Sequence, residues 1–237
     1  MNLHRLALLA LVIPSLAQAH ISIASGPALA NKSGQKITFA INHGCTATGG
    51  AKLDTLSIKI DIPNGIDPTS VRALPSDFGA TPIVSRTGNN VTAVQWNRNP
   101  ADLQAADDAY YELTLRLKVL DVPFTRIPFV LTQVCRPQGG TATDDVTVVW
   151  TGPETAVEPS PQLTVVPPHV AGWHKVTLSA PVTAANMGVY FGDAQIVWRG
   201  TAAYSSNAFT AALIAMTSGA TALTTDLVAG DEIWVKY

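Results

Sequence analysis

The sequence predicts an all-β protein: an immunoglobulin-like β-sandwich followed by a smaller β-rich C-terminal domain. Three observations support this prediction. Short runs of residues between positions 36 and 166 alternate apolar and polar side chains, which is typical of half-buried strands. Turn-forming residues separate these runs at short intervals. A proline-rich stretch then precedes a tail whose aromatic and β-branched residues need burial. A closed barrel is the main alternative for the first part.

The chain opens with the features of a secretory signal peptide. Met1–Arg5 carries one firm positive charge, Leu6–Ile13 is apolar but too short to span a bilayer, and Ala17-Gln18-Ala19 matches a signal-peptidase site. We therefore expect residues 1–19 to be removed, and the mature protein to begin at His20 in the periplasm or outside the cell. The alternative is a buried N-terminal helix or a retained membrane anchor.

A histidine at the first position of a mature chain is a metal chelator in itself. Its α-amine and its imidazole Nδ1 belong to one residue, so together they close a six-membered ring on an ion with little loss of entropy. Amine and imidazole nitrogens suit Cu(II), which also heads the affinity order of the divalent first-row metals. His20 is therefore the candidate copper ligand. The alternative is that a histidine stands first by coincidence.

Two segments show the clearest strand alternation. In Leu56–Ile62 the apolar residues occupy even positions, and in Leu113–Val119 they occupy odd positions. Weaker alternation predicts further strands at residues 36–41, 91–96, 127–135, 146–150 and 163–166. About seven short strands at this spacing are typical of a two-sheet sandwich.

The chain has two cysteines, Cys45 and Cys135, on an early and a late predicted strand. In an oxidising compartment an isolated pair of this kind predicts one disulfide. The alternatives are two reduced buried thiols, or a redox-active or metal-binding pair. The spacing is far too long for a Cys-x-x-Cys site, which favours the disulfide.

The chain is expected to divide near its prolines. Residues 20–166 form the predicted sandwich, residues 167–172 a linker, and residues 173–237 the C-terminal domain of unknown role. In that domain we expect strands at 176–178, 188–191, 194–198 and 233–237, and either a short helix or a buried strand at 209–216. Four tryptophans are predicted to be core residues: Trp96, Trp173, Trp198 and Trp234.

An ordered set of short motifs resembles the YcnI-like copper-binding proteins of bacteria over roughly residues 20–166. The motifs are His20-Ile21-Ser22-Ile23, Asn42-His43-Gly44-Cys45, Ile62-Pro63-Asn64-Gly65-Ile66, Val94-Gln95-Trp96, Gln133-Val134-Cys135, Trp150 and residues 159–165. The resemblance implies an immunoglobulin-like fold and one Cu2+ ion held by a single-histidine brace at His20, with Trp150 beside the metal. It also implies a metallochaperone or scavenger role in copper trafficking or homeostasis. A membrane copper transporter or another copper-handling protein would then be the partner.

This chain departs from the family pattern at two places. Gly26-Pro27-Ala28-Leu29 stands where the family has an acidic residue, and Asp77-Phe78-Gly79 replaces a glycine–tryptophan pair. The acidic copper ligand is therefore not identified, and Asp77 is a candidate without a supporting motif. His43 is a candidate second imidazole ligand, the alternative being a local hydrogen-bonding role.

Trp150 can be interpreted in two ways. A neutral indole has an N–H donor but no free nitrogen lone pair, so it would serve as a wall beside the ion rather than as a ligand. Alternatively, Trp150 is an inward core residue together with Val146 and Val148, which share its parity.

Composition and motifs limit the other functions. The formal net charge of −2 disfavours a nucleic-acid partner, which would need a basic surface. Motifs typical of serine hydrolases, phosphate-binding loops and zinc proteases are missing from the sequence, so we expect no enzyme. One enzymatic alternative is a histidine-brace oxygenase related to lytic polysaccharide monooxygenases, with His43 or a linker histidine completing the brace. The other alternative is an adhesion or carbohydrate-binding sandwich without a metal.

Overall fold

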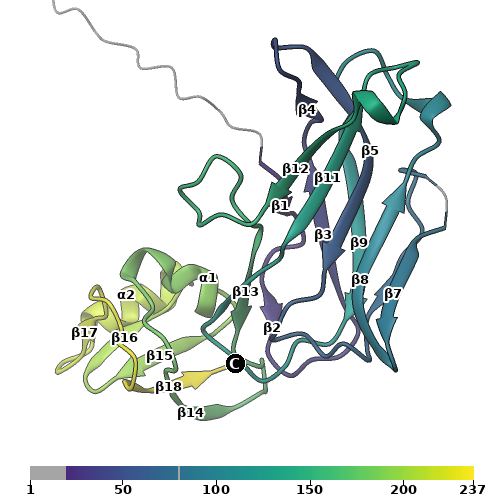
Figure 1. The fold of residues 1–237 in the computed structure, drawn as a ribbon. Helices are drawn as coiled ribbons and strands as arrows, with labels where there is room; N and C mark the ends of the chain where they lie inside the picture. The colour runs from purple at the N-terminus through teal and green to yellow at the C-terminus, as the bar shows by residue number, and fades with distance from the viewer. Residues whose placement is uncertain (1–19, 80) are drawn as a thin grey trace, which may run out of the picture.

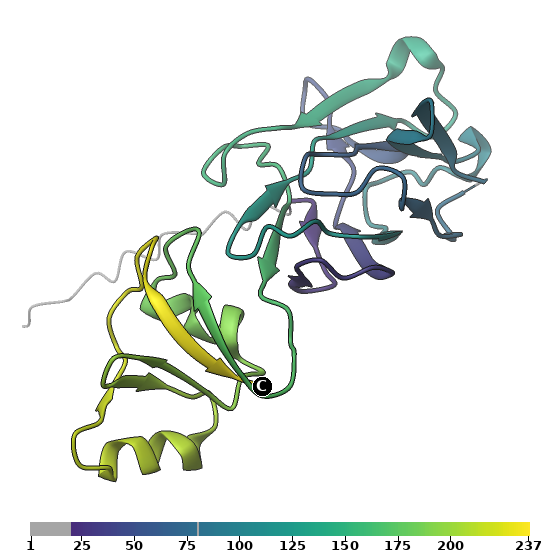
Figure 2. The ribbon, with the colours of Figure 1, turned by 90° about the horizontal axis from the view of Figure 1, so that it is seen from below.

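The computed structural model describes residues 20–79 and 81–237, so the predicted signal peptide lies outside the described residues. Figure 1 shows a larger part made mostly of strands and a smaller C-terminal part beside one end of it. Figure 2 shows the same arrangement from below. The predicted all-β fold is confirmed. Within the described ranges, no helix is long and apolar enough to cross a membrane.

The first part is a sandwich of two facing sheets closed at one end by a third. The four-stranded sheet has the order β1 (Ser22–Ile23), β3 (Gln35–Ile41), β9 (Tyr111–Leu117) and β6 (Arg72–Ala73). The facing sheet has the order β12 (Val146–Trp150), β11 (Leu131–Arg136), β5 (Lys52–Asp61), β8 (Asn90–Asn97) and β7 (Ile83–Thr87), and β4 (Cys45–Thr46) also pairs with β5. The third sheet consists of β10 (Arg126–Pro128), β13 (Gln162–Val166) and β2 (Ala28–Leu29).

One hydrophobic core fills the space between the two large sheets. The predicted alternation along 113–119 is confirmed, since Leu113, Leu115 and Leu117 are buried whereas Glu112 and Arg116 are exposed. The core joins these residues to side chains from the opposite sheet: Ile58, Ile60, Val94, Trp96 and Leu131. Burial of this much apolar surface is the main contribution to the stability of the sandwich.

Two details of the predicted strands are corrected. Residues 127–135 form two strands, β10 and β11, which belong to different sheets. The break follows Pro128, which has no N–H to donate to a ladder. β7 was not predicted, because all of its five side chains are exposed and no burial pattern marks it. Two 3-10 turns complete this part, at Pro100–Asp102 and Ala142–Asp144.

The C-terminal part is one sheet covered on one face. Its order is β14 (Trp173–Thr177), β18 (Glu232–Lys236), β15 (Ile196–Arg199), β16 (Ala202–Tyr204) and β17 (Thr221–Ala222). The helices are α1 (Met187–Phe191), which follows a 3-10 turn at Ala184–Asn186, and α2 (Ala208–Met216). The buried residues of α1 pack in one core with buried residues of the sheet, including Val197, Ile233 and Val235.

The structure decides two predictions for this part. The strand predicted at 188–191 is wrong, because the segment belongs to helix α1, in which Met187, Tyr190 and Phe191 are buried with helical spacing. Four residues were too few to distinguish the two periods. Residues 209–216 form a helix whose N-cap, Asn207, accepts hydrogen bonds from the N–H groups of Phe209 and Thr210.

The tryptophans do not all lie in the core as predicted. Trp96 is fully buried, which confirms the prediction for the sandwich. Trp173 and Trp234 are 48% and 49% exposed, and Trp198 is half-buried, so the prediction is wrong for the C-terminal sheet. These rings point away from the face that α1 covers.

The two parts contact each other directly. Phe124 of the first part packs against Tyr190 and Phe191 of α1, with ring centroids 5.8 Å and 5.9 Å apart. The Ser179 hydroxyl donates a hydrogen bond to the Pro123 carbonyl at 2.7 Å. The C-terminal core therefore continues into the end of the sandwich.

Candidate metal site

A pocket of about 510 Å³ lies at the end of the sandwich that is marked by β4, β12 and the start of β1. It brings together three residues that the sequence singled out separately, His20, His43 and Trp150. The other lining residues are Gly44, Cys45, Thr46, Lys52, Asp107, Gln133, Val148, Val157 and Glu158.

His20 is held at this pocket by its neighbours in the chain. Ile21 is buried in the core, and Ser22 pairs with Ala40 where β1 joins β3. The Asn42 side chain donates a hydrogen bond from Nδ2 to the His20 carbonyl oxygen at 2.7 Å. The backbone on the carboxyl side of His20 is thereby fixed while its ring reaches the pocket.

The Trp150 ring forms one wall of the pocket. It is only 4% exposed and belongs to the sandwich core, and its centroid lies 6.2 Å from that of the His20 ring in an edge-on arrangement. Its Nε1–H donates to the Gln133 Oε1 atom at 3.1 Å. Since the indole N–H already has this partner and carries no lone pair, Trp150 can border an ion but not ligate it through nitrogen.

Gln133 connects the wall to the other side of the pocket. Its side chain is fully buried, and its Nε2 group donates to the His43 carbonyl oxygen at 2.9 Å and to the Thr55 hydroxyl at 2.8 Å. Together with the bond from Trp150, this satisfies the buried amide group. One side chain therefore fixes both the indole ring and the backbone that carries His43.

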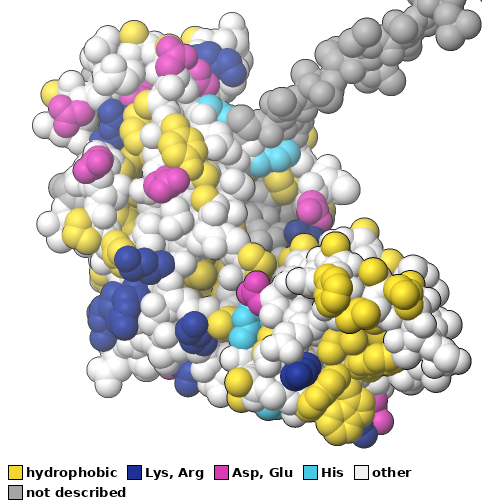
Figure 3. All heavy atoms as spheres, turned by 180° about the vertical axis from the view of Figure 1, so that it is seen from behind, with side chains coloured by type: hydrophobic (Ala, Val, Ile, Leu, Met, Phe, Trp, Pro, Cys, Tyr) yellow, Lys and Arg dark blue, Asp and Glu magenta, His cyan; other side chains and the backbone are white. Residues whose placement is uncertain are grey.

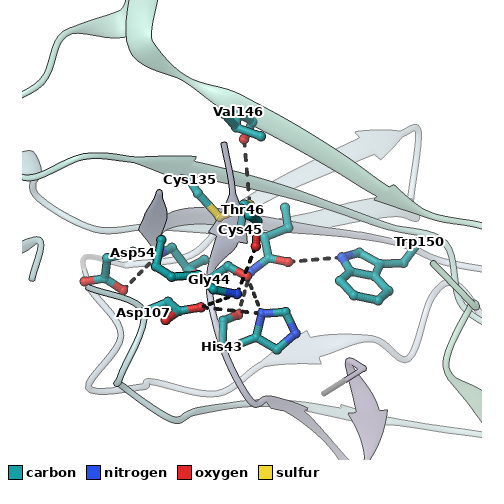
Figure 4. Close-up of a disulfide and its surroundings, with 12 residues drawn as sticks. His43, Gly44, Cys45, Thr46, Asp54, Asp107, Cys135, Val146 and Trp150 are labelled. Carbon is teal, nitrogen blue, oxygen red and sulfur yellow. Dashed lines mark hydrogen bonds and ion pairs between the residues drawn. A yellow bond between two sulfur atoms is a disulfide. The ribbon is translucent and has the colours of Figure 1, made fainter. Parts of the chain in front are cut away.

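The segment from His43 to Thr46 lines the pocket, and Figure 4 shows these residues beside the disulfide. At Gly44 a Cβ atom would lie only 1.7 Å from the Leu53 carbonyl oxygen, so no other residue fits. The His43 Nδ1 atom contacts the Gly44 carbonyl oxygen and lies 4.0 Å from the Asp107 Oδ2 atom. Because a carbonyl only accepts, Nδ1 is the donor in this contact, and Nε2 is the ring nitrogen that is left to bind a metal.

The predicted disulfide between Cys45 and Cys135 is confirmed, with an S–S distance of 2.01 Å. It joins β4 to β11 within one sheet, rather than linking the two sheets as in antibody domains. Because β11 carries Gln133 and β4 follows His43, the bond fixes two pocket segments against each other. It is drawn beside His43 in Figure 4.

Oxygen donors surround the pocket without completing a metal cage. Asp107 is mostly buried and lies 3.9 Å from the Lys52 ammonium group, and Glu158 is exposed at the rim. Asp77 lies in a separate hollow with Phe78 and is not part of this pocket. In the described part of the chain, no group of three or more His, Cys, Asp or Glu side chains is arranged to hold a metal ion.

Several pocket residues were not recognised as such from the sequence. Asn42 and Gln133 belong to the quoted motifs, but their hydrogen-bond partners are distant in the sequence. Asn42 bonds to His20, 22 residues away, and Gln133 bonds to His43, 90 residues away. One signal was present for Gln133, a polar residue at an inward position of an apolar strand. Asp107 and Glu158 lie on loops and carry no such signal.

Comparisons with known proteins supply no family. No family model matches the sequence, and no curated protein matches it. An uncharacterized protein from Nocardia farcinica, described as having an immunoglobulin-like fold, is similar over 62% of this chain and 98% of its own, with 18% identity and a TM-score of 0.46. The sixth cohesin from scaffoldin B of Acetivibrio cellulolyticus, solved with the Cel5 dockerin, is similar over 62% and 97%, with 9% identity and a TM-score of 0.33. At these levels of similarity neither structure bears on function.

Proposed function

We propose that the mature protein begins at His20, binds one Cu2+ ion through the amine and imidazole of that residue, and acts in copper trafficking or homeostasis outside the cytoplasm rather than as an enzyme. One observation supports this most. The residue that cleavage would make the first lies at a pocket beside Trp150, with its carbonyl group held by Asn42.

The surrounding residues suit a copper ion that is carried as cargo. The two nitrogens of His20 would form the chelate, and Nε2 of His43, which lines the same pocket, is a candidate for a further nitrogen ligand. The carboxylates of Asp107 and Glu158 line the same pocket and would compensate the positive charge of the Cu2+ ion. Trp150 excludes water from one side, while Gln133 and the disulfide keep the pocket formed when it is empty. A site with few protein donors also favours release to a transporter or another copper-handling protein.

The proposal can be tested by blocking the α-amine of His20. Cu2+ affinity should be measured for protein that begins at His20 and for the same protein with one alanine added before it. The addition removes one donor of the chelate, so we expect the affinity to fall by orders of magnitude while the fold is retained. Equal affinity in the two proteins would contradict the single-histidine brace. It would indicate that any copper binds to internal histidines such as His43.

Substitutions within the pocket separate the roles of its residues. His20→Ala should abolish stoichiometric Cu2+ binding, and Trp150→Phe should alter the electron paramagnetic resonance spectrum without unfolding the protein. His174→Ala is the matched control, since this histidine lies on β14 in the C-terminal sheet, away from the pocket. An unchanged spectrum for Trp150→Phe would leave Trp150 a core residue only.

His43 favours one second candidate, a histidine-brace oxygenase, because it lines the same pocket as His20. A two-histidine brace requires both rings, so His43→Ala would then weaken Cu2+ binding as strongly as His20→Ala. The single-histidine site predicts a much smaller loss for His43→Ala. Copper titration of the two variants side by side distinguishes the candidates.

A further inference from the structure

One face of the C-terminal sheet carries a row of tryptophans. In the ladder, Trp173 lies opposite Lys236 on β18, and Trp234 lies opposite both Lys175 on β14 and Trp198 on β15. Side chains directly opposite each other share a face of the sheet, and residues two apart on one strand share it as well. Trp173, Trp198 and Trp234 therefore project from the same face, which we call the tryptophan face.

The opposite face of the sheet is the one that is buried. Val197, Ile233 and Val235 alternate with the tryptophan-face residues and pack in one core with Phe191 of α1. On the tryptophan face, by contrast, about half of the Trp173 and Trp234 surfaces is exposed. Figure 3 shows hydrophobic side chains gathered on the C-terminal part of the molecule. Exposed apolar surface of this kind marks an interaction site.

The sheet fixes the positions from which the three indoles project. They lie on three adjacent hydrogen-bonded strands, which are about 4.8 Å apart. Trp198 and Trp234 are directly opposite each other, so their Cβ atoms are about 5 Å apart, and Trp173 is the diagonal neighbour of Trp234 at about 7–8 Å. Indoles spaced over three neighbouring strands fit an extended ligand that crosses those strands.

The charges on this face select the kind of ligand. Lys175 forms an ion pair with Glu232 at 2.8 Å, and the Lys236 ammonium group lies 5.9 Å from the centre of the Trp173 ring. With one lysine paired to a glutamate, the tryptophan face does not carry the continuous positive charge that binding to a nucleic acid or to an anionic lipid surface requires. Ile196, opposite Lys236, and Ala203, opposite Trp198, are the aliphatic residues that the register of β15 places on this face.

A neutral polysaccharide matches all of these features. The C–H face of a pyranose ring stacks on an indole, and its hydroxyl groups form hydrogen bonds with ammonium and carboxylate groups placed between the rings. We propose that the tryptophan face is a binding platform for flat, neutral, β-linked polysaccharides, with Trp173 and Trp234 as the main stacking residues. This site is independent of the proposed copper site and would hold the exported protein on a glycan surface.

Retention of the mature protein on microcrystalline cellulose and on chitin tests the platform. We expect the unmodified protein to be retained on at least one of them, and Trp173→Ala combined with Trp234→Ala to reduce the bound fraction at least tenfold. Phe209→Ala combined with Met216→Ala is the control, because these exposed apolar residues lie on α2. The control should bind as the unmodified protein does, and circular dichroism should show that all three are folded.

Three results would overturn the platform. The first is that the unmodified protein is retained on neither polysaccharide. The second is that the α2 variant loses retention as strongly as the tryptophan variant, which would indicate general apolar adhesion. The third is that the tryptophan variant is retained normally. Binding to phosphatidylglycerol vesicles without binding to either polysaccharide would assign the face to a membrane surface instead.

Discussion

In the first part of the chain Trp96 faces a second sheet and is inaccessible to solvent, whereas in the C-terminal part Trp173 and Trp234 face solvent over about half of their surfaces. All three lie on β-strands, in which successive side chains point to opposite faces of the sheet. The difference arises from the number of layers, because the sandwich covers both inner faces while α1 covers only one face of the C-terminal sheet. Alternation thus determines which residues share a face, and the neighbouring layer determines whether that face is buried.

The same comparison separates two kinds of candidate site. The pocket at His20 is built from segments that are far apart in the chain and fixed by a disulfide and by the buried Gln133 side chain. The tryptophan face needs no such convergence, since consecutive ladder pairs place its rings. Truncating the buried residues that hold the first region together should therefore destabilise the protein more than truncating residues of the tryptophan face.

The largest contrast is expected between Trp96→Ala and Trp234→Ala. Removing a fully buried tryptophan creates a cavity and should lower the free energy of unfolding by about 3–5 kcal/mol. Removing the half-exposed Trp234 should change it by roughly 0.5 kcal/mol or less. Denaturant unfolding of the two variants measures both values. Comparable losses would show that the tryptophan face is covered in the native protein.

Loss of the disulfide should produce the next largest effect. Replacing Cys45 and Cys135 together by serine should lower the free energy of unfolding of the sandwich by about 2–5 kcal/mol, because the bond closes a long loop with a sequence separation of 90. The C-terminal sheet contains no cysteine and should unfold as before. Guanidinium unfolding, with Trp173 and Trp234 fluorescence reporting on the C-terminal sheet, checks this, and an unchanged sandwich transition would contradict it.

The sequence predicted most of the fold where alternation was long and one-sided. The run from Leu113 to Val119 is the best example, since seven residues distinguish a period of two from a helical period. The four residues from Gly188 to Phe191 could not do so, and the exposed strand β7 has no buried face to reveal it. The secondary structure of such short segments depends on their tertiary contacts, which a single sequence does not reveal.

The sequence predicted two residues of the candidate site but not the hydrogen bonds that hold the site together. His20 followed from the expected cleavage point and Trp150 from the family resemblance, and the structure places both at one pocket. Gln133 joins Trp150 to the segment that carries His43, because its amide bonds to both. Hydrogen bonds between segments 17 to 90 residues apart leave no local pattern in a single sequence.

A smaller effect is expected from Gln133→Leu. The substitution leaves the Trp150 N–H and the His43 carbonyl without their partner, and an unsatisfied buried polar group costs about 1–3 kcal/mol. The Trp150 indole N–H resonance should shift and exchange faster with solvent. Gln162→Ala is the control, because its amide bonds only to Ser160 outside the pocket. A Trp150 resonance that is unchanged by Gln133→Leu would show that packing alone positions the ring.

The smallest effect concerns two tyrosines, one in each part, and it emerges only in alkali. Burial, followed by the negative charge of Asp54, raises the pKa of Tyr111 to about 12, and burial, followed by Asp193, raises the pKa of Tyr237 to about 12. An unfolded tyrosine ionises near pH 10.0. Each group's contribution to stability is therefore fully present below pH 10 and is lost as the pH rises towards 12.

Phenylalanine at each position distinguishes the two parts. The Tyr111 hydroxyl donates to the Asp54 carboxylate at 3.0 Å, so Tyr111→Phe should destabilise the sandwich at neutral pH as well. The Tyr237 hydroxyl is buried without a hydrogen-bond partner among the described residues, so Tyr237→Phe should be nearly neutral at pH 7. It should, however, reduce the loss of stability between pH 10 and pH 12, because no phenol remains to ionise in the unfolded chain. Urea unfolding of both variants across this range measures the effect. If Tyr237→Phe loses as much stability between pH 10 and pH 12 as the unmodified protein, the loss arises in the sandwich alone.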